Sequence, residues 1–301
     1  RTFYFANAEQ RRLDQSGFAT ISVSSVATVN ARLAAVGYPG QTITSGIYDT
    51  PIDSLNLLGK IDHAFTGRDQ LSVRYSLYDV VSENSRGAGG LSAPSASAGI
   101  DNRDQAVSVS NTLTLGARTV NETRAQYTHS DLLALPTDPV GPAVNIAGAA
   151  AFGTFPSSPQ GRLNRMFQLV NTLAQQRGPH ALRAGVDLVY NDDTITFPRA
   201  VRGSYAFASL ANFLAGTYNN AGFTQTFGDT VVQQGSTGLG LYVQDEWSAT
   251  PRLTLNLGLR YDLQMLETID TDTNNLSPRA GFAWTPFDSR DLVVRGSAGL
   301  Y

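Results

Sequence analysis

Charged side chains recur at every second position in several segments of this sequence, and their types suit a wall that binds polar groups. Arg260 and Asp262, for example, alternate with Leu259 and Tyr261. Side chains two residues apart lie on one face of a strand, so such a face can pair opposite charges or guide a polar ligand. The same parity collects ten charged residues that we predict to line one wall: Arg74, Glu122, Arg124, Arg183, Asp187, Glu246, Arg260, Asp262, Arg279 and Arg295. The alternative is a solvated sheet face whose charges compensate one another without any function.

One polar segment has part of the spacing of a calcium loop. Asp270, Asp272 and Asn274 place side-chain oxygens at the first, third and fifth positions. A calcium loop also needs glycine at the sixth position and glutamate at the twelfth, where Asn275 and Gly281 stand. We therefore predict a polar loop and no metal site.

The histidines do not form a catalytic pattern. His63, His129 and His180 share no metal-ligand spacing, and the His, Ser and Asp side chains of the run 129–131 alternate between the two faces of a strand. The sequence has no cysteine, which excludes thiolate metal sites and disulfides. We predict a protein that is not an enzyme and needs no cofactor.

Composition narrows the class of protein further. The 301 residues carry 22 basic and 25 acidic side chains, and the arginines are scattered, which argues against a nucleic-acid partner. No run of about 18 apolar residues exists, so a membrane-spanning helix is excluded. A transmembrane barrel is not excluded, because its strands carry their hydrophobicity in alternation.

The segment from Leu253 to Leu263 shows what must position the charged residues. Apolar and polar or small residues alternate there over 11 positions. This length suits a strand that crosses a bilayer, which needs about 9–11 residues. The segment 239–247 alternates as well, and the turn 248–252 joins the two into a predicted hairpin. Asp245 falls on the apolar parity, close to the turn, where a membrane interface tolerates charge.

Alternation along the whole chain predicts about eleven strands with two kinds of connection. The strands are expected near 1–9, 55–66, 69–81, 105–116, 118–130, 165–176, 180–191, 238–248, 252–264, 278–286 and 291–301. Short turns (66–69, 116–118, 177–180, 248–252 and 287–291) alternate with long connections (10–54, 82–104, 131–164, 192–237 and 265–277). Long and short connections then lie at opposite ends of the sheet, as in outer-membrane barrels, whereas soluble sandwiches show no such bias.

Two long connections carry helical spacing. Ser25 is predicted to cap a helix that continues to Val36, and the residues from Phe207 to Leu214 repeat the pattern before Gly216. We expect both helices to pack folded loops.

Two asparagines break the apolar parity. Asn111 and Asn171 share the parity of Leu113 and Leu173. Each marks a bulge, a contact with a neighbouring polar residue, or an error in the predicted register.

The same hairpin carries a family resemblance. Tyr242–Trp247 and Pro251–Asp262 resemble the barrel signature of TonB-dependent outer-membrane receptors. The resemblance extends to Gly178–Asp187, Leu276–Trp284 and Val293–Tyr301. Thr2–Phe5, Gly203–Phe207 and Asn212–Gly216 are similar to the Oar-like subgroup.

The resemblance implies a barrel of about 22 strands that is plugged by an N-terminal domain and imports large, scarce ligands with energy delivered through TonB. This chain would be one domain over residues 1–301: part of an all-β, antiparallel, up-and-down transmembrane barrel with long external loops and short periplasmic turns. Both ends fall inside strand patterns, so we expect an excerpt without the plug and the last strands.

The expected function is therefore active transport at the cell outer membrane. The partners would be the lipid bilayer, the plug, TonB and a peptide, glycan or metal chelate. Loop aromatics are the expected ligand contacts, with packing of the loops as the alternative: Tyr38, Tyr48, Phe152, Phe155, Tyr205 and Tyr218. A passive porin or adhesin barrel and a soluble extracellular β-sandwich that binds a ligand are the competing hypotheses.

Overall fold

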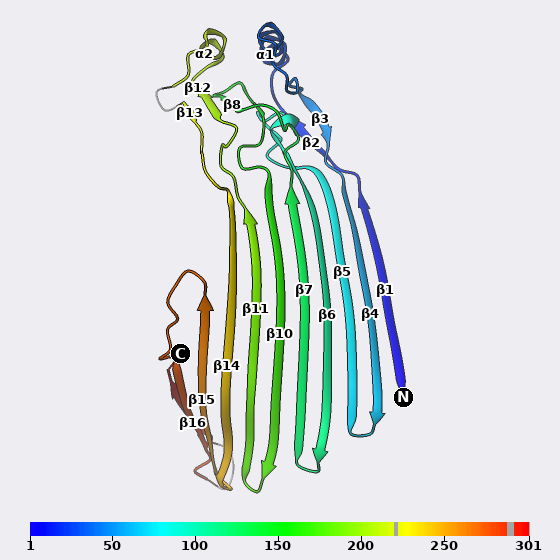
Figure 1. Cartoon of the computed structure of the whole chain (residues 1–301), viewed down its shortest axis with the longest axis vertical. Coiled ribbons are helices and arrows are strands. Elements are labelled where there is room, and N and C mark those ends of the chain that lie inside the picture. Colours follow the sequence, from blue (N-terminus) through cyan, green and yellow to red (C-terminus); the bar gives the residue numbers. More distant parts are fainter. Residues whose placement is uncertain (220–221, 288–291, 301) are drawn as a thin grey trace.

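A computed structural model describes residues 1–219, 222–287 and 292–300, and one large antiparallel sheet dominates it (Figure 1). The sheet has 11 strands in the order β1-β4-β5-β6-β7-β10-β11-β14-β15-β16-β17, so each strand pairs with the next long strand along the chain. These strands are β1 (Thr2–Leu13), β4 (Ile52–Thr66), β5 (Asp69–Arg86), β6 (Ala98–Gly116), β7 (Thr119–Ala134), β10 (Gln160–Arg177), β11 (His180–Thr196), β14 (Val231–Thr250), β15 (Leu253–Leu266), β16 (Leu276–Trp284) and β17 (Val294–Gly299).

All of the strands predicted from alternation are present, which confirms the all-β, antiparallel, up-and-down fold. β1 and β17 are the edge strands, and the sheet of described residues is not closed. Residues 288–291 and 301, which belong to the last predicted turn and strand, lie outside the described residues.

The strands extend further toward the long loops than alternation indicates. β6 begins at Ala98 and β14 at Val231, about seven residues before the predicted starts, and β5 continues to Arg86. Lipid requires side-chain alternation only over the hydrocarbon layer, whereas backbone groups need partners everywhere. The hydrogen-bond ladder therefore continues where the sequence pattern has stopped.

The register of the sheet separates its side chains into two faces. Paired residues share a face, so Leu257, Leu259 and Val243 lie together, and Arg260 lies with Tyr242. We call these the apolar face and the polar face. Leu257 is 46% exposed and Leu259 44%, and among the described elements no second sheet covers them. A soluble sandwich would bury this face, whereas a bilayer covers it with lipid.

The polar residues on the apolar face form hydrogen bonds with neighbouring side chains. Asn111 and Asn171 pair in continuous register, so neither marks a bulge. Asn171 Nδ2 instead donates to Asn121 Oδ1 at 3.2 Å, and Asn121 Nδ2 donates to Asn171 Oδ1 at 3.1 Å. Asp245 Oδ2 lies 2.7 Å from Nδ1 of His180 on the adjacent strand.

Four long loops fold together above one end of the sheet (Figure 1). We call residues 14–51, 87–97, 135–159 and 197–230 the loop cap. It contains β2 (Ser16–Ala19), α1 (Val23–Ala35), β3 (Gly46–Asp49), the 3₁₀ helix η1 (Pro94–Ala96), β8 (Ala143–Ile146), β9 (Ala150–Gly153), β12 (Ser204–Phe207), α2 (Leu210–Ala215) and β13 (Phe223–Thr224). β13, β12, β8 and β9 form a small sheet, and β2 pairs with β3.

The hydrophobic core of the described chain lies in this cap. All four loops contribute to it, and its members are Ile21, Val29, Leu33, Ile43, Ala93, Val144, Ile146, Ala149, Ala150, Phe152 and Phe207. A sheet one layer thick has no interior of its own, so only the loops can bury apolar side chains against one another. Neither helix of the described chain has the length and apolar character needed to cross a membrane.

Both predicted helices are present, but each begins at a different residue from the one predicted. Ser22, not Ser25, caps α1, because its side chain accepts a hydrogen bond from the Ser25 backbone N–H at 3.1 Å. Ser209 caps α2, and Phe207 belongs to the strand before it. Gly216 ends α2 with φ of 70°, a left-handed conformation that favours glycine.

The apolar face yields a test of its contact with lipid. Leu259→Arg, near the middle of β15, should lower the free energy of unfolding in lipid vesicles by about 2–4 kcal/mol. Gln244→Arg on the polar face should change it little. Denaturant unfolding of the full-length protein in vesicles measures both, and equal effects would contradict the assignment of the faces.

The cap core yields a second test. Phe152 is 1% exposed, so Phe152→Ala should destabilise the cap by about 3–5 kcal/mol. Hydrogen exchange should accelerate in the four loops and stay slow in the long strands. Phe227→Ala is the matched control, because Phe227 is 82% exposed. Unchanged exchange in the Phe152 variant would show that the loops do not share a core.

Candidate functional site

The predicted polar wall forms one continuous face. The register links Arg260 to Tyr242, Gly185, Thr172 and Glu122 across five strands. The same register places all ten predicted charged residues on this polar face. Their contact with a plug or a ligand stays a prediction.

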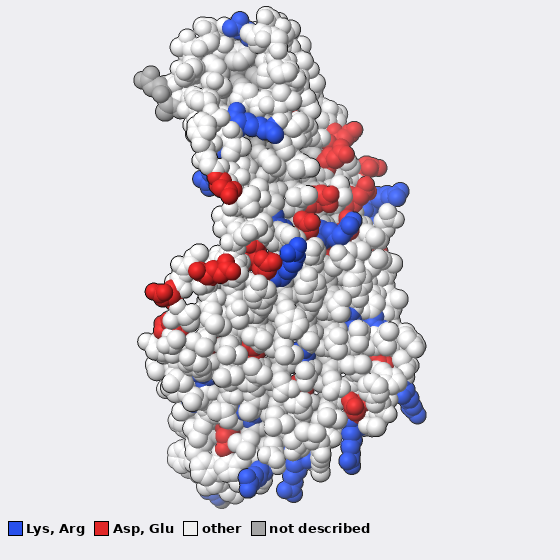
Figure 2. All heavy atoms as spheres, in the orientation of Figure 1, with Lys and Arg blue, Asp and Glu red and all other residues white. Residues whose placement is uncertain are grey.

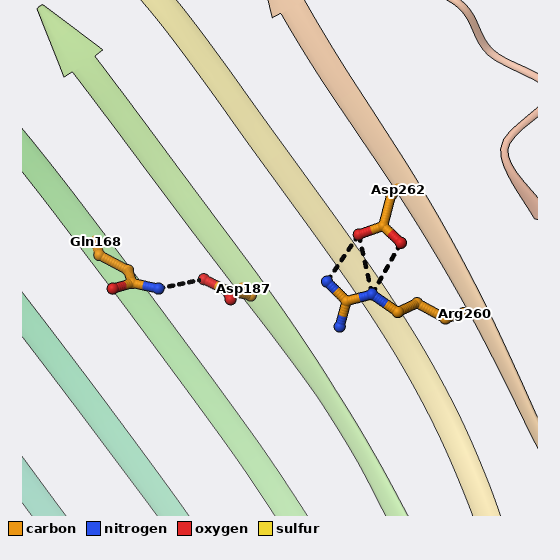
Figure 3. A network of polar contacts seen from close by, with 4 residues as sticks. All are labelled: Gln168, Asp187, Arg260 and Asp262. Atoms are coloured by element: carbon orange, nitrogen blue, oxygen red, sulfur yellow. Dashed lines mark hydrogen bonds and ion pairs between the residues drawn. The ribbon is translucent and has the colours of Figure 1, made fainter. Parts of the chain in front are cut away.

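Several of these charged side chains have hydrogen-bond partners within the wall (Figure 3). Arg260 donates from Nη2 to Asp262 Oδ1 at 2.7 Å and from Nε to Oδ2 at 2.8 Å. Gln168 Nε2 donates to Asp187 Oδ1 at 2.9 Å. Residues two apart on one strand can pair in this way without distorting the backbone. Such exposed pairs contribute little stability, about 0–1 kcal/mol, so their main effect is on the charge that the wall presents.

An open hollow of 560 Å³ lies on this face. Its charged lining is Glu122, Arg183, Arg260 and Arg279. Arg124 pairs with Glu122 at 2.6 Å, and Arg260 pairs with Asp262. Arg183 forms no ion pair with any other described residue. Arg183 therefore presents guanidinium donors in the hollow that suit a carboxylate or another anion.

Tyr242 and Thr172 form the neutral part of the hollow, and alternation alone did not single them out. The Tyr242 hydroxyl lies 2.9 Å from Thr172 Oγ1. Gly185, between them in the register, is required for this arrangement, because a Cβ there would lie 2.6 Å from the Tyr242 ring. The polar parity of Tyr242 was the available signal in the sequence.

Asp138 joins two loops of the cap. It is completely buried, and its carboxylate accepts hydrogen bonds from the Val140 N–H at 2.8 Å, the Gln41 N–H at 3.2 Å and the Tyr38 hydroxyl at 3.3 Å. Burial, together with the adjacent carboxylate, raises the pKa of Tyr38. Tyr38 therefore stays a neutral donor, and its hydroxyl is used inside the cap. The run 138–141, Asp-Pro-Val-Gly, is a turn signal that marks this position in the sequence.

The loop aromatics that were predicted to contact a ligand lie in separate parts of the structure. The Tyr205 ring centroid lies 4.7 Å from that of Phe223 and 5.6 Å from that of Tyr218, which is 50% exposed. Phe155 lies against Arg86, with the guanidinium carbon 5.8 Å from the ring centroid.

The remaining predicted contacts are occupied by packing within the cap. Phe152 packs edge-on against Phe213, inside the core, so its ring packs the loops together and is not available to a ligand. Tyr48 is half-buried over Gly17. The structure thus brings Tyr205 and Tyr218 together and leaves the others in separate contacts.

The described residues contain no group of three or more His, Asp or Glu side chains placed to hold a metal ion. In the segment 270–275, Asp272 Oδ1 accepts from the Asn274 N–H at 3.1 Å, and Asn275 Nδ2 donates to the Asp272 carbonyl at 3.0 Å. These contacts describe a polar turn that folds on itself.

Comparison with known proteins identifies the family to which this chain is similar. Residues 48–268, well over half of the chain, match the family model described as outer membrane beta barrel domain. Over 130 residues the chain is 33% identical to the TonB-dependent transporter Oar of Myxococcus xanthus, a match that covers 36% of this chain and 12% of that protein.

Solved structures share the fold. The outer membrane transporter YddB from Escherichia coli superposes with a TM-score of 0.63 at 14% identity, covering 99% of this chain and 36% of that one. The ferripyoverdine receptor of Pseudomonas aeruginosa superposes with a TM-score of 0.55 at 12% identity, covering 98% of this chain and 41% of that one. The chain thus spans less than half the length of each of these proteins.

The matched relatives are transporters and receptors of the outer membrane, not enzymes. The apolar face is accordingly the lipid-facing surface, and the polar face is the inner wall. This chain is located in the outer membrane and belongs to the family of outer membrane beta barrel domains.

Proposed function

We propose that this chain is the wall and the external loop cap of a TonB-dependent transport receptor. The observation that carries the proposal is a folded cap, built from four loops, at the end of a wall whose inner face is polar. A cap with its own core holds its surface in place and suits capture of a ligand. The similarity to the transporter Oar supports the same conclusion.

The chain supplies one domain in this proposal. Its 11 long strands would form about half of a barrel of about 22 strands, closed by strands that this chain does not contain. The arginines of the hollow would receive carboxylates of a plug that fills the barrel, and TonB would act on that plug.

Capture would take place at the exposed aromatic cluster of the cap. Tyr205 contacts both Tyr218 and Phe223, and Tyr218 is half exposed. Aromatic rings bind apolar and cationic parts of peptides, the faces of sugars and aromatic metal chelators alike. The ligand is therefore a peptide, a glycan or a metal chelate in this proposal, and Phe155 is a further candidate contact, whereas Tyr38 and Tyr48 serve the packing of the cap.

The passive porin or adhesin barrel is the alternative that an experiment must separate. The full-length protein in a planar bilayer should be closed, because a plug fills the wall. Arg183→Glu should raise the frequency of openings several-fold, since carboxylates of the plug would meet a negative charge. Arg202→Glu, on an exposed loop, is the control. Steady conductance of the unmodified protein would favour the porin.

Energy coupling has its own test. Cells that express the full-length protein, with and without TonB, are offered radiolabelled iron chelates, peptides and oligosaccharides as probes. We expect accumulation of one probe class only when TonB is present. Equal accumulation in both strains would contradict active transport.

A further inference from the structure

Every short turn that the structure describes completely carries an arginine. Arg68 lies between β4 and β5, Arg118 between β6 and β7, Arg177 at the end of β10, and Arg252 between β14 and β15. All four side chains are exposed. Basic side chains project along the lower end of the molecule in Figure 2, where Figure 1 places these turns. The arginines thus form a row along the turn end of the wall.

The backbone fixes three of these turns against the next hairpin. The carbonyl of Arg68 accepts from the Thr114 N–H at 2.7 Å, that of Arg118 from the Gln176 N–H at 2.8 Å, and that of Arg252 from the Thr285 N–H at 2.8 Å. Each of these turns is thereby attached to the strand of the next hairpin. The row is a property of the sheet and not of independent flexible tips.

Two carboxylates close to the turns already have partners. Asp69, next to Arg68, accepts from Asn111 Nδ2 at 2.7 Å, and Asp245 is held by His180. Arg68, Arg118 and Arg177 form no ion pair with any described residue. Three positive charges at this end are therefore available to an external anion.

A second, independent feature lies just above the row, on the lipid-facing surface. We call Asn111, Asn121, Thr123 and Asn171 the amide patch. Asn171 Nδ2 donates to Thr123 Oγ1 at 2.8 Å as well as to Asn121, and the register places Thr123 opposite Asn111. Polar side chains are unfavourable against hydrocarbon, so the amide patch indicates that the polar headgroup layer, and not the acyl chains, lies at its level.

We propose that the arginine row binds the headgroups of anionic phospholipids in the leaflet that surrounds the short turns, at the level that the amide patch marks. Guanidinium groups pair with phosphate in two parallel hydrogen bonds. The side-chain N–H groups of the amide patch are already bonded to protein acceptors, so the arginines supply the donors to phosphate. Basic side chains next to a membrane also gain from its negative surface potential. The proposal requires the outer-membrane location and does not depend on transport or on TonB.

The location of the row favours lipid over an acidic protein as the occupant. The amide patch shares its face with Leu113 and Leu173, so the polar surface continues directly from the surface that contacts acyl chains. Trp247 stacks on His180 on this same face beside a turn, with ring centroids 5.3 Å apart. Tryptophan at this level is typical of the bilayer interface.

The test compares lipids retained by the full-length protein in native mass spectrometry, with phosphatidylglycerol and phosphatidylethanolamine as probes. Arg68→Gln/Arg118→Gln/Arg177→Gln should lower retention of phosphatidylglycerol by a factor of about ten or more and leave phosphatidylethanolamine unchanged, because each basic residue contributes severalfold to attraction toward an anionic surface. Arg11→Gln/Arg12→Gln/Arg202→Gln removes the same charge near the loop end and should have no effect.

The amide patch is tested separately. Asn121→Leu/Asn171→Leu replaces both partners of a reciprocal hydrogen bond with apolar groups, so the barrel should still fold. Retention of phosphatidylglycerol should stay as in the unmodified protein, because the arginines and not the amides contact phosphate. An unchanged lipid ratio in the triple arginine variant, or an equal loss in its control, would overturn the proposal, and so would a loss in the asparagine variant as large as that in the triple arginine variant.

Discussion

A sheet one layer thick in a bilayer must satisfy two demands at once. Every backbone N–H and C=O group must pair within the ladder, because hydrocarbon offers no partner, and side chains must alternate between lipid and the interior. The segment 253–263 meets both demands, with leucines on one face and Arg260 and Asp262 on the other. The up-and-down order of the strands and the short turns follow from this constraint, because neighbours in sequence complete the ladder most directly.

The same constraint moves the hydrophobic core out of the membrane-spanning part. The wall exposes its apolar side chains, so cooperative burial is possible only where the loops meet. Val29, Ala93, Phe152 and Phe207 come from four different loops and pack in one cluster. The cap is consequently a folded unit with fixed surfaces, and Asp138 holds its first and third loops together. In the proposed receptor, the polar wall and the structured cap would be the two surfaces that face the ligand.

Alternation predicted every long strand and the face of every charged wall residue, because lipid imposes a period of two that is visible locally. It did not predict the ends of the strands near the loops, where only the backbone ladder continues. Nor could it predict the cap core, since Tyr38 and Asp138 are 100 residues apart and leave no periodic pattern. The sequence also left three explanations open for Asn171, because its partner Asn121 lies on the adjacent strand, 50 residues away.

The central claim is that this sheet separates lipid from an interior along its whole length. The chain has no cysteine, so single cysteines placed in turn from 253 to 263 in the full-length protein can carry a fluorophore without competing sites. The account predicts that a quencher attached to lipid chains quenches odd positions strongly and even positions weakly, with a period of two. Quenching that does not alternate, or odd positions shielded from lipid, would contradict it.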